Sequence, residues 1–340
     1  MDHIAIDLGA QESQVCVRQP DGMIIEERRC TTRSLSTFLR RRPKSRVIVE
    51  TCSEAFSIAD KALELGHEVR VVPGSLVRSL GIGSRGVKND RKDAQVLSEV
   101  SCRIDLPSVH IPTAMSRERK TLCGMREALV QCRTKAVNTV RGWLRGQTLR
   151  IRSGVVETFP RRVREGLAAD GIVLPQHVER QLTAIEGLTG QVLLADEELA
   201  LAAQSDQTCR RLMTVPGVGP VAAIRFAAAI DDVGRFGDAH AVASYLGLVP
   251  GEDSSSTRQR RTGITKAGPP KLRWALMQAS WSARRTRPTD PIVLWCLQIE
   301  QRRGRQIAMV ALARKLAGVL YAIWRDGTTY EAHRTAAQKN

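Results

Sequence analysis

Aromatic residues, paired cysteines and long apolar runs are all scarce in this chain of 340 residues. Aromatic residues make up 4% of the sequence, so we expect hydrophobic cores built mainly from aliphatic side chains. The eight cysteines include no CxxC pair and the six histidines are dispersed, which argues against a zinc site or a disulfide framework. These absences favour a cytoplasmic protein with reduced thiols.

Membrane and export signals are missing as well. No stretch approaches the roughly 20 consecutive apolar residues of a membrane-spanning helix. The N-terminal segment MDHIAIDLGAQ has an acid at position 2 and only a short apolar run, unlike a signal peptide. We therefore expect no membrane partner, and a globular protein long enough for two domains.

Acidic residues are strongly outnumbered by basic ones. The sequence holds 52 Lys+Arg against 35 Asp+Glu, which gives a formal net charge of +17. A surplus of this size on a folded protein indicates a polyanionic partner, and nucleic acid is the first candidate. A solvated basic surface is the alternative, although it rarely needs so one-sided an excess.

The N-terminal third alternates short apolar runs with helical patterns. The expected order is three strands, a helix, a strand, a helix, a strand and a helix, which is the order of a ribonuclease-H-like fold. A doubly wound sheet shares these periodicities. The expected strands are HIAIDLG, ESQVCVRQ, MIIEERRC, RVIVET and EVRVVP, and the expected helices are TRSLSTFLRR, SIADKALELGH and DAQVLSEVSCRI.

A helical connector is expected next. Apolar residues recur at helical spacing over 114–147, with basic residues on the other faces, which predicts a long basic amphipathic helix. Residues 175–204 carry a short heptad pattern, which pairs either with a second chain or with another helix of the same chain. Its strict seven-residue step is formed by Val178, Ile185, Val192 and Leu199.

The C-terminal part is predicted to be mostly helical. Pro-Gly-Val-Gly-Pro between two apolar helical stretches predicts a helix–hairpin–helix, in which Gly217 and Gly219 can hold a backbone phosphate; a plain glycine-rich turn is the alternative. The expected fold class is thus α/β plus α. Its parts are an α/β domain over 1–110, a basic-helix and coiled-coil connector over 111–207, and a helical domain over 208–335.

Four carboxylates form a candidate metal site. Asp7 lies in the first apolar strand, where an unpaired charge is costly to bury, and Glu50 ends another strand. Asp90 and Asp93 share one helix face in the segment KNDRKDA, and helix capping is the alternative reason for them. Acids at neighbouring strand ends and on a crossing helix suit Mg²⁺ in phosphoryl transfer. The adjacent basic residues, expected to contact phosphate, are Lys88, Arg91 and Lys92.

The pattern AIDLGA…VIVET…KNDRKDA, followed by VPGVGP…YLGLVPGEDSSSTRQRRTGITKAG, resembles the DEDD transposases of bacterial insertion sequences. These are relatives of the Piv DNA invertase and include bridge-RNA-guided recombinases. The resemblance covers residues 1–105 and 208–325. It implies a RuvC-like N-terminal domain in which Asp7, Glu50, Asp90 and Asp93 hold Mg²⁺.

The resemblance also implies a serine nucleophile that attacks the scissile phosphate and forms a covalent protein–DNA intermediate. By its position after the GLVP segment, Ser255 matches, and Ser254 and Ser256 remain rivals. Ser256 stands where the family usually has glycine, and Thr265 replaces the serine of its GISK segment. The loop holds no histidine, so activation by the metal is expected. The remaining candidate DNA contacts are Arg258, Arg260, Arg261, Lys266 and Lys271.

The family further implies DNA and a structured noncoding guide RNA as partners, and a homo-oligomer, dimer or tetramer, in which one chain's serine domain complements another's acidic domain. The expected function is an RNA-guided recombinase that acts as a transposase. Two alternatives remain open on the residues alone. One is a RuvC-like junction nuclease that uses water, and the other is a non-catalytic nucleic-acid-binding protein.

Overall fold

A computed structural model describes residues 1–79, 90–253 and 261–332, and the side chains at positions 78, 79, 90 and 261 also lie outside the described part. The chain divides into two units, Met1–Pro112 and Thr113–Asn340. The expected separation of a connector from a C-terminal domain near residue 207 stays a prediction.

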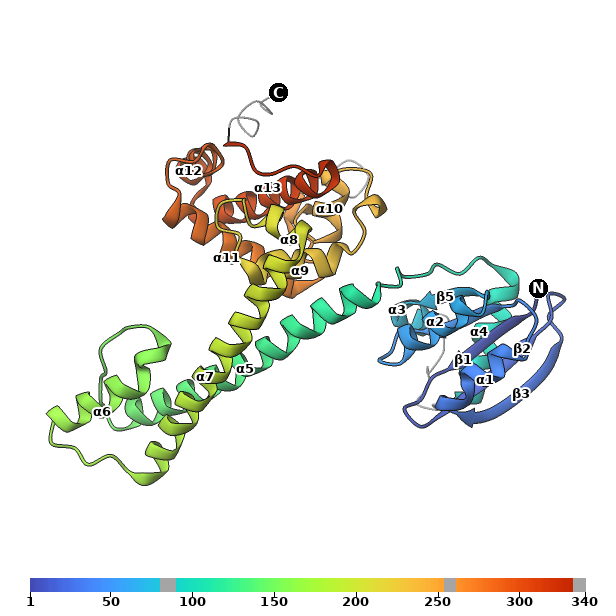
Figure 1. Ribbon diagram of the computed structural model, residues 1–340, viewed down its shortest axis with the longest axis horizontal. Helices are drawn as coiled ribbons and strands as arrows, with labels where there is room; N and C mark the ends of the chain where they lie inside the picture. The colour runs from blue at the N-terminus through green and yellow to red at the C-terminus, as the bar shows by residue number, and fades with distance from the viewer. Residues whose placement is uncertain (80–89, 254–260, 333–340) are drawn as a thin grey trace. The chain divides into compact units, whose positions relative to one another are not determined.

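The first unit is built on a five-stranded sheet with the spatial order β3-β2-β1-β4-β5 (Figure 1). The first three strands pair antiparallel, whereas β1, β4 and β5 run parallel to one another. Side chains alternate between the two faces of each strand. The strands are β1 (His3–Asp7), β2 (Glu12–Arg18), β3 (Ile24–Thr31), β4 (Arg46–Glu50) and β5 (Glu68–Val72).

Helices cover both faces of this sheet. One face packs against α1 (Leu35–Arg40) and α2 (Ala55–Glu64) through a core that includes Ile4 and Ile6 of β1. The other face packs against α4 (Asp90–Arg103) through Ala5 and its neighbours. A short helix absent from the sequence prediction, α3 (Gly74–Ser79), follows β5. The predicted α/β character of this part of the chain is confirmed.

The second unit begins with a long antiparallel helical hairpin, α5 (Ala114–Gly146) and α7 (Gln176–Ser205) (Figure 1). Val178 and Ile185 of the predicted heptad share a core with Val140 and Leu144 of α5. Both remaining heptad positions are buried too. The heptad stripe therefore packs against a helix of its own chain.

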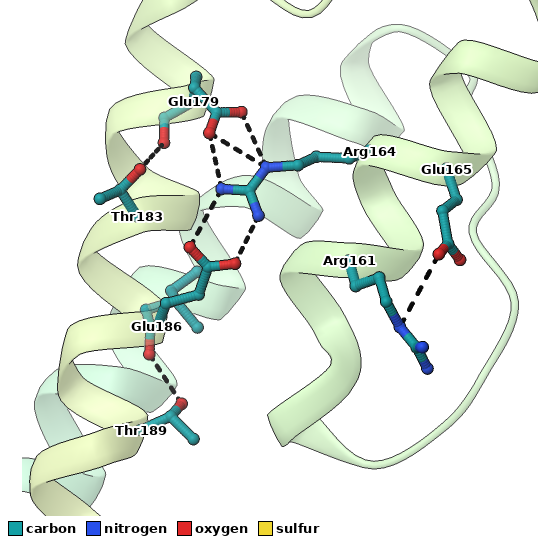
Figure 2. Close-up of polar contacts among 8 residues, drawn as sticks. Arg161, Arg164, Glu165, Glu179, Thr183, Glu186 and Thr189 are labelled. Atoms are coloured by element: carbon teal, nitrogen blue, oxygen red, sulfur yellow. Dashed lines mark hydrogen bonds and ion pairs between the residues drawn. The ribbon is translucent and has the colours of Figure 1, made fainter.

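A third helix, α6 (Phe159–Ala169), is tied to the side of α7 by one arginine. Figure 2 shows the Arg164 guanidinium lying between the carboxylates of Glu179 and Glu186, with Nε donating to Glu179 at 3.0 Å. These hydrogen bonds lower the pKa of Glu179. Arg164 thus fixes the loop-rich segment between α5 and α7.

The rest of the second unit is a helical body, as predicted for the C-terminal part. Its last helix, α13 (Arg305–Asp326), is long and apolar enough to cross a membrane, but its apolar face, from Ala308 to Ile323, lies in the largest hydrophobic core of the unit. We therefore treat it as a core helix. The elements are α8 (Gln207–Leu212), α9 (Pro220–Ile230), α10 (Ala239–Tyr245), β6 (Pro250–Glu252), β7 (Arg261–Ile264), α11 (Pro270–Thr286), α12 (Pro291–Arg303) and α13 (Arg305–Asp326).

Candidate functional site

Two carboxylates lie at one edge of the sheet in the first unit. Asp7 ends β1 and Glu50 ends β4, and the parallel pairing of Ile6 with Val49 places these ends side by side. Ala5 and Ile48, two residues earlier in each strand, both pack in the core on the α4 side. Since side chains alternate along a strand, Asp7 and Glu50 belong to this same α4-covered face. Both residues are half-buried.

Helix α4 brings a third acid towards this edge. Near its C-terminal end, Ser101 Oγ lies 2.7 Å from Nδ1 of His3, at the start of β1. Leu97 shares the core of Ala5, further along the strand. The helix therefore runs antiparallel to β1, and its first turns, which carry the half-buried Asp93, lie towards the Asp7 end.

The donor set at this edge fits a hard divalent cation, because it consists of carboxylate oxygens. Within residues 1–79, 90–253 and 261–332, however, no group of three or more His, Cys, Asp or Glu side chains is placed to hold a metal ion. Glu50 Oε1 lies over the start of α3, where a Cβ added to Gly74 would be 2.6 Å from it. The side chain of Asp90, the first residue of α4, lies outside the described part.

The basic residues around the acid pair differ in their surroundings. Arg91 donates from Nε to Glu27 of β3 at 3.0 Å, and this hydrogen bond is the main cause that lowers the pKa of Glu27. Arg91 therefore ties the first turn of α4 to the sheet. Lys92 is exposed, and Lys88 lies outside the described residues.

In the second unit, the β6–β7 hairpin brackets the predicted nucleophile segment. The antiparallel pairs are Pro250 with Ile264 and Glu252 with Arg261, whose side chain is not described. The chain therefore leaves and re-enters the described body at adjacent points. The predicted site residues between these strands that lie outside the described part are Ser254, Ser255, Ser256, Arg258 and Arg260.

Close backbone contacts hold the base of this hairpin. The amide of Lys266 donates to Gly247 O at 3.1 Å, and Lys266 itself has a positive φ of 57°. Gly268 has a φ of +73°, and a Cβ there would lie 1.9 Å from Tyr245 O. Only glycine fits this position, because a side chain would meet both unfavourable backbone geometry and a carbonyl oxygen.

Arg273 of α11 reinforces the same place. Its Nη1 donates to the carbonyl oxygens of Leu246, Ala267 and Gly268, at distances of 3.0, 2.6 and 3.1 Å. One half-buried guanidinium thus joins the end of α10 to the turn between β7 and α11. Sequence reasoning missed Arg273, since no motif marks an arginine that bonds only to backbone carbonyls.

The predicted phosphate-binding glycines lie in the turn between α8 and α9. Gly217 has a φ of +78°, and a Cβ there would lie 2.1 Å from Ala279 O of α11, so its small size is needed for helix packing. Gly219 is the N-cap residue of α9, forms no side-chain cap and has open space beside it. Of the two glycines, Gly219 is the one with room for a ligand.

Lys271, another predicted DNA contact, belongs to an ion-pair cluster. Its Nζ lies 2.7 Å from Glu127 Oε1, and Arg225 donates to Glu127 Oε2 at 2.8 Å. Burial opposes the charge of Glu127, but hydrogen bonds from Lys271 and Gln131 and the charge of Arg225 outweigh it and hold the pKa of Glu127 below its ordinary range. This cluster joins α5, α9 and α11.

Comparison with known proteins shows that the region with the acidic edge and the region with the serine segment both match transposases. Residues 4–148 match a DEDD model of the IS110 type described as a transposase, and residues 209–291 match the model described as "Transposase IS116/IS110/IS902 family". The chain is 27% identical over 333 residues to the transposase for insertion sequence element IS1111A of Coxiella burnetii, covering 96% of this chain and 90% of the relative. It is 28% identical over 343 residues to a probable family 20 transposase of Pseudomonas aeruginosa, covering 97% and 98%.

The chain belongs to the IS110/IS116/IS902 transposase family. The predicted resemblance to DEDD transposases of insertion sequences is therefore confirmed. A similar match extends to the transposase for insertion sequence element IS1328 of Yersinia enterocolitica, at 26% identity over 96% of this chain and 98% of the relative.

Each family model covers one of the two candidate regions of the transposase. The predicted acidic positions 7, 50, 90 and 93 lie within the first match, and the serines at 254–256 lie within the second. Membership implies that the protein processes DNA and that its DEDD domain depends on a divalent metal in general. The roles of the individual residues stay predictions.

Proposed function

We propose that this transposase cleaves and rejoins DNA through a covalent phosphoserine–DNA intermediate, with Ser255 as nucleophile and Mg²⁺ held by Asp7, Glu50, Asp90 and Asp93. The observation that carries the proposal is the placement of Asp7 and Glu50 on one face of two adjacent parallel strand ends, at the edge that the first turn of α4 approaches.

The first unit is proposed to be a ribonuclease-H-like domain of the RuvC type. Three antiparallel strands followed by two parallel ones, in the order β3-β2-β1-β4-β5, support this assignment. The helix that crosses the sheet on the acidic face supports it as well. In such an architecture, carboxylates from two strands and one crossing helix can approach one edge of the sheet.

The metal would be held by Asp7 and Glu50 together with the two aspartates of α4. A divalent ion bound there supplies positive charge that stabilises attacking and leaving oxygens during phosphoryl transfer. The protein's own contribution is to orient the carboxylates, which the Ile6–Val49 strand pairing and the His3–Ser101 contact support. Glu50 would have to turn from its position over Gly74 to join a shared site.

The serine is proposed to attack the scissile phosphate through its hydroxyl oxygen. The hydroxyl proton passes to solvent, a bond forms between the serine oxygen and phosphorus, and the bond between phosphorus and the leaving 3′ or 5′ oxygen of the DNA breaks. The leaving oxygen takes up a proton from solvent and departs as a hydroxyl. A hydroxyl on another strand end then displaces the serine, so the phosphodiester is restored without ATP. Arg258, Arg260 and Arg261 are proposed to stabilise charge on the phosphate.

Guidance by a structured noncoding RNA and assembly into a homo-oligomer complete the proposal. The net charge of +17 supports binding to nucleic acid, and base pairing would then supply sequence choice. Three arginines of α5 are used within the chain, however: Arg119 pairs with Asp206, Arg126 with Asp196 and Arg133 with Glu157. The exposed Lys120, Lys135 and Arg145 of α5 are the better candidates for RNA contacts. A cytoplasmic location stays a prediction.

A RuvC-like nuclease that uses water is the second candidate, because the acidic edge alone would serve it equally well. A covalent adduct separates the two. The full-length protein, its element's noncoding RNA, Mg²⁺ and DNA spanning the element junction would be incubated and then denatured. The readout is a protein–DNA adduct that survives denaturation, compared across single alanine variants of Ser254, Ser255 and Ser256.

We expect loss of the adduct in Ser255→Ala alone among the three serine variants, and also in Asp7→Asn and Asp93→Asn. Thr257→Val, which removes a neighbouring hydroxyl from the same segment, is the matched control and should retain the adduct. DNA cleavage by the wild type without an adduct would refute the serine mechanism. The nuclease that uses water would then be the remaining candidate. Recombination that persists in Asp7→Asn would refute the metal site.

A further inference from the structure

Two tryptophans stand exposed on one side of α11. Trp274 and Trp281 are seven residues apart, which is about two helical turns, so both project from the same face of the helix. Their side chains are 50% and 36% exposed. Gln278 and Arg285 lie on the same face of α11 and are also exposed, so the four residues form an exposed stripe. Large aromatic surfaces grouped in this way on a protein with few aromatic residues indicate a binding surface.

The stripe borders a cavity of about 390 Å³. The opposite wall is the start of α9, where Gly219 and Pro220 form an N-terminus without a side-chain cap. The amides of that first turn carry the positive end of the helix dipole. The cavity therefore combines flat aromatic walls with a positive rim.

The charged side chains that line the cavity are all basic. Arg126 and Arg285 are among its lining residues, and no acidic side chain is found among the lining residues that the structure describes. Arg126 is engaged with Asp196, at 2.8 Å from Nε to Oδ1. Arg285 forms no ion pair within residues 113–253 and 261–332, so its charge is available to an anion from outside.

We infer that this cavity takes an unstacked base of single-stranded DNA, with the base against the tryptophan rings and a flanking phosphate near Arg285. Aromatic side chains bind bases through their π-faces, which in a duplex are covered by neighbouring bases. A duplex would therefore be excluded from the aromatic contact. DNA is the favoured occupant because the family processes DNA. The inference rests on the proposed function only in requiring that separated strands occur during the reaction.

Two substitutions at one position separate stacking from simple packing. Trp281→Leu keeps an apolar side chain but removes the ring, whereas Trp281→Phe keeps a ring. Binding of the full-length protein to a short fluorescein-labelled single-stranded DNA, and to the same sequence as a duplex, would be followed by anisotropy. We expect roughly tenfold weaker binding of the single strand by Trp281→Leu and Trp274→Leu, with most of the affinity retained by Trp281→Phe.

The contribution of Arg285 is tested in the same assay. Arg285→Gln should weaken single-strand binding by several-fold, on the order of one phosphate contact. Arg303→Gln removes the same charge from the exposed end of α12, away from the cavity, and should have a smaller effect. Duplex binding should change little in either tryptophan variant. Quenching of wild-type tryptophan fluorescence by single-stranded DNA is a second readout that needs no variant.

Unchanged single-strand affinity in both leucine variants, or absence of quenching, would overturn the inference. Equal losses for duplex and single strand would also overturn it, as would tighter Trp281-dependent binding of an RNA of the same sequence. The covalent adduct is measured separately. A missing adduct together with tryptophan-dependent binding would refute the proposed serine mechanism and leave this site standing.

Discussion

Ser101 Oγ lies 2.7 Å from His3 Nδ1, and this buried contact fixes the end of α4 to the beginning of β1. Because the helix runs antiparallel to the strand, the contact at one end of the sheet determines which residues of α4 reach the acidic edge at the other. A position remote from the carboxylates is thus coupled to their placement.

The first prediction concerns pH. Burial, followed by the charges of Arg46 and the chain's N-terminus, lowers the pKa of His3 from its ordinary value of 6.5. A group whose pKa is lowered by folding takes up a proton more readily when unfolded, so its stabilising effect is present above pH 6.5 and is lost as the pH falls through the folded value. Amide hydrogen exchange in β1 and α4, corrected for intrinsic rates, should therefore accelerate from pH 7 to pH 5.

His3→Gln should weaken this pH dependence, because glutamine does not titrate in that range. His177→Gln, at an exposed position of α7, is the control and should leave exchange in the first unit as in the wild type. Equal pH dependence in the wild type and in His3→Gln would contradict the assignment to this histidine.

The second prediction separates metal binding from stability. Alanine at Gly74 would bring a Cβ to 2.6 Å from Glu50 Oε1, the far end of a flexible side chain, so Glu50 should move at small cost. We expect the midpoint of thermal unfolding to stay within a few degrees of the wild type, consistent with a cost of about 1 kcal/mol or less. Affinity for Mg²⁺ or Mn²⁺, measured by calorimetric titration, should change by several-fold if Glu50 is a ligand.

Gly142→Ala, in open space on α5, is the matched glycine control and should leave metal affinity unchanged. Identical metal affinity in Gly74→Ala and the wild type would argue that Glu50 does not bind the metal. In that case, Glu50→Gln should also leave the metal affinity unchanged.

The third prediction concerns the base of the serine hairpin. Gly268→Ala combines a φ of +73° with a Cβ 1.9 Å from Tyr245 O, so we expect a loss of stability of about 2 kcal/mol and a strongly reduced adduct yield. Gly263→Ala changes the same residue type within β7 with no atom within 4 Å of the added Cβ. A Gly268→Ala protein with wild-type stability and adduct would show that this close contact does not position the hairpin.

The fourth prediction tests the Glu127 cluster. Arg225 is 8% exposed, so Glu127→Gln would leave a nearly buried charge without its carboxylate and should cost about 3 kcal/mol at pH 7. Because folding lowers the pKa of Glu127, this contribution is present above its ordinary value of 4.5 and is lost as the pH falls below it. Urea unfolding followed by tryptophan fluorescence suits the test, since all five tryptophans lie in the second unit.

The wild type and Glu127→Gln should therefore differ less in unfolding free energy at pH 4 than at pH 7. Glu197→Gln, an exposed position on α7, removes a carboxylate of the same type and should have an effect below about 0.5 kcal/mol. A pH-independent difference between Glu127→Gln and the wild type would contradict the electrostatic explanation.

Local patterns predicted much of the first unit. Short apolar runs, such as the one that contains Ile4 and Ile6, are enough to locate strands, and the expected strand order supports placing Asp7 beside Glu50. The short helix after β5 was missed, because its residues, beginning with Gly74, carry no clear helical signal. The neighbouring side chain of Glu50 makes that omission relevant to function.

Contacts between residues far apart in the chain could not be predicted from the sequence. The sequence predicts a basic face on the helix that corresponds to α5, yet Arg119 and Arg126 pair with acids far along the chain. Equally, the spacing that marks Val178 and Ile185 as heptad positions is satisfied by any helix packed alongside, and only the fold identifies α5 as that partner. Likewise, the sequence around Gly217 predicts a turn but does not predict its close contact with α11.

The paired strands β6 and β7 have a consequence for how this family diversifies. A segment that departs and returns through adjacent hydrogen-bonded residues, above a base closed by Gly247, Gly268 and Arg273, imposes no length on what lies between its ends. Relatives would be free to vary the length of the segment between β6 and β7 around the proposed nucleophile without rebuilding the helices that carry it.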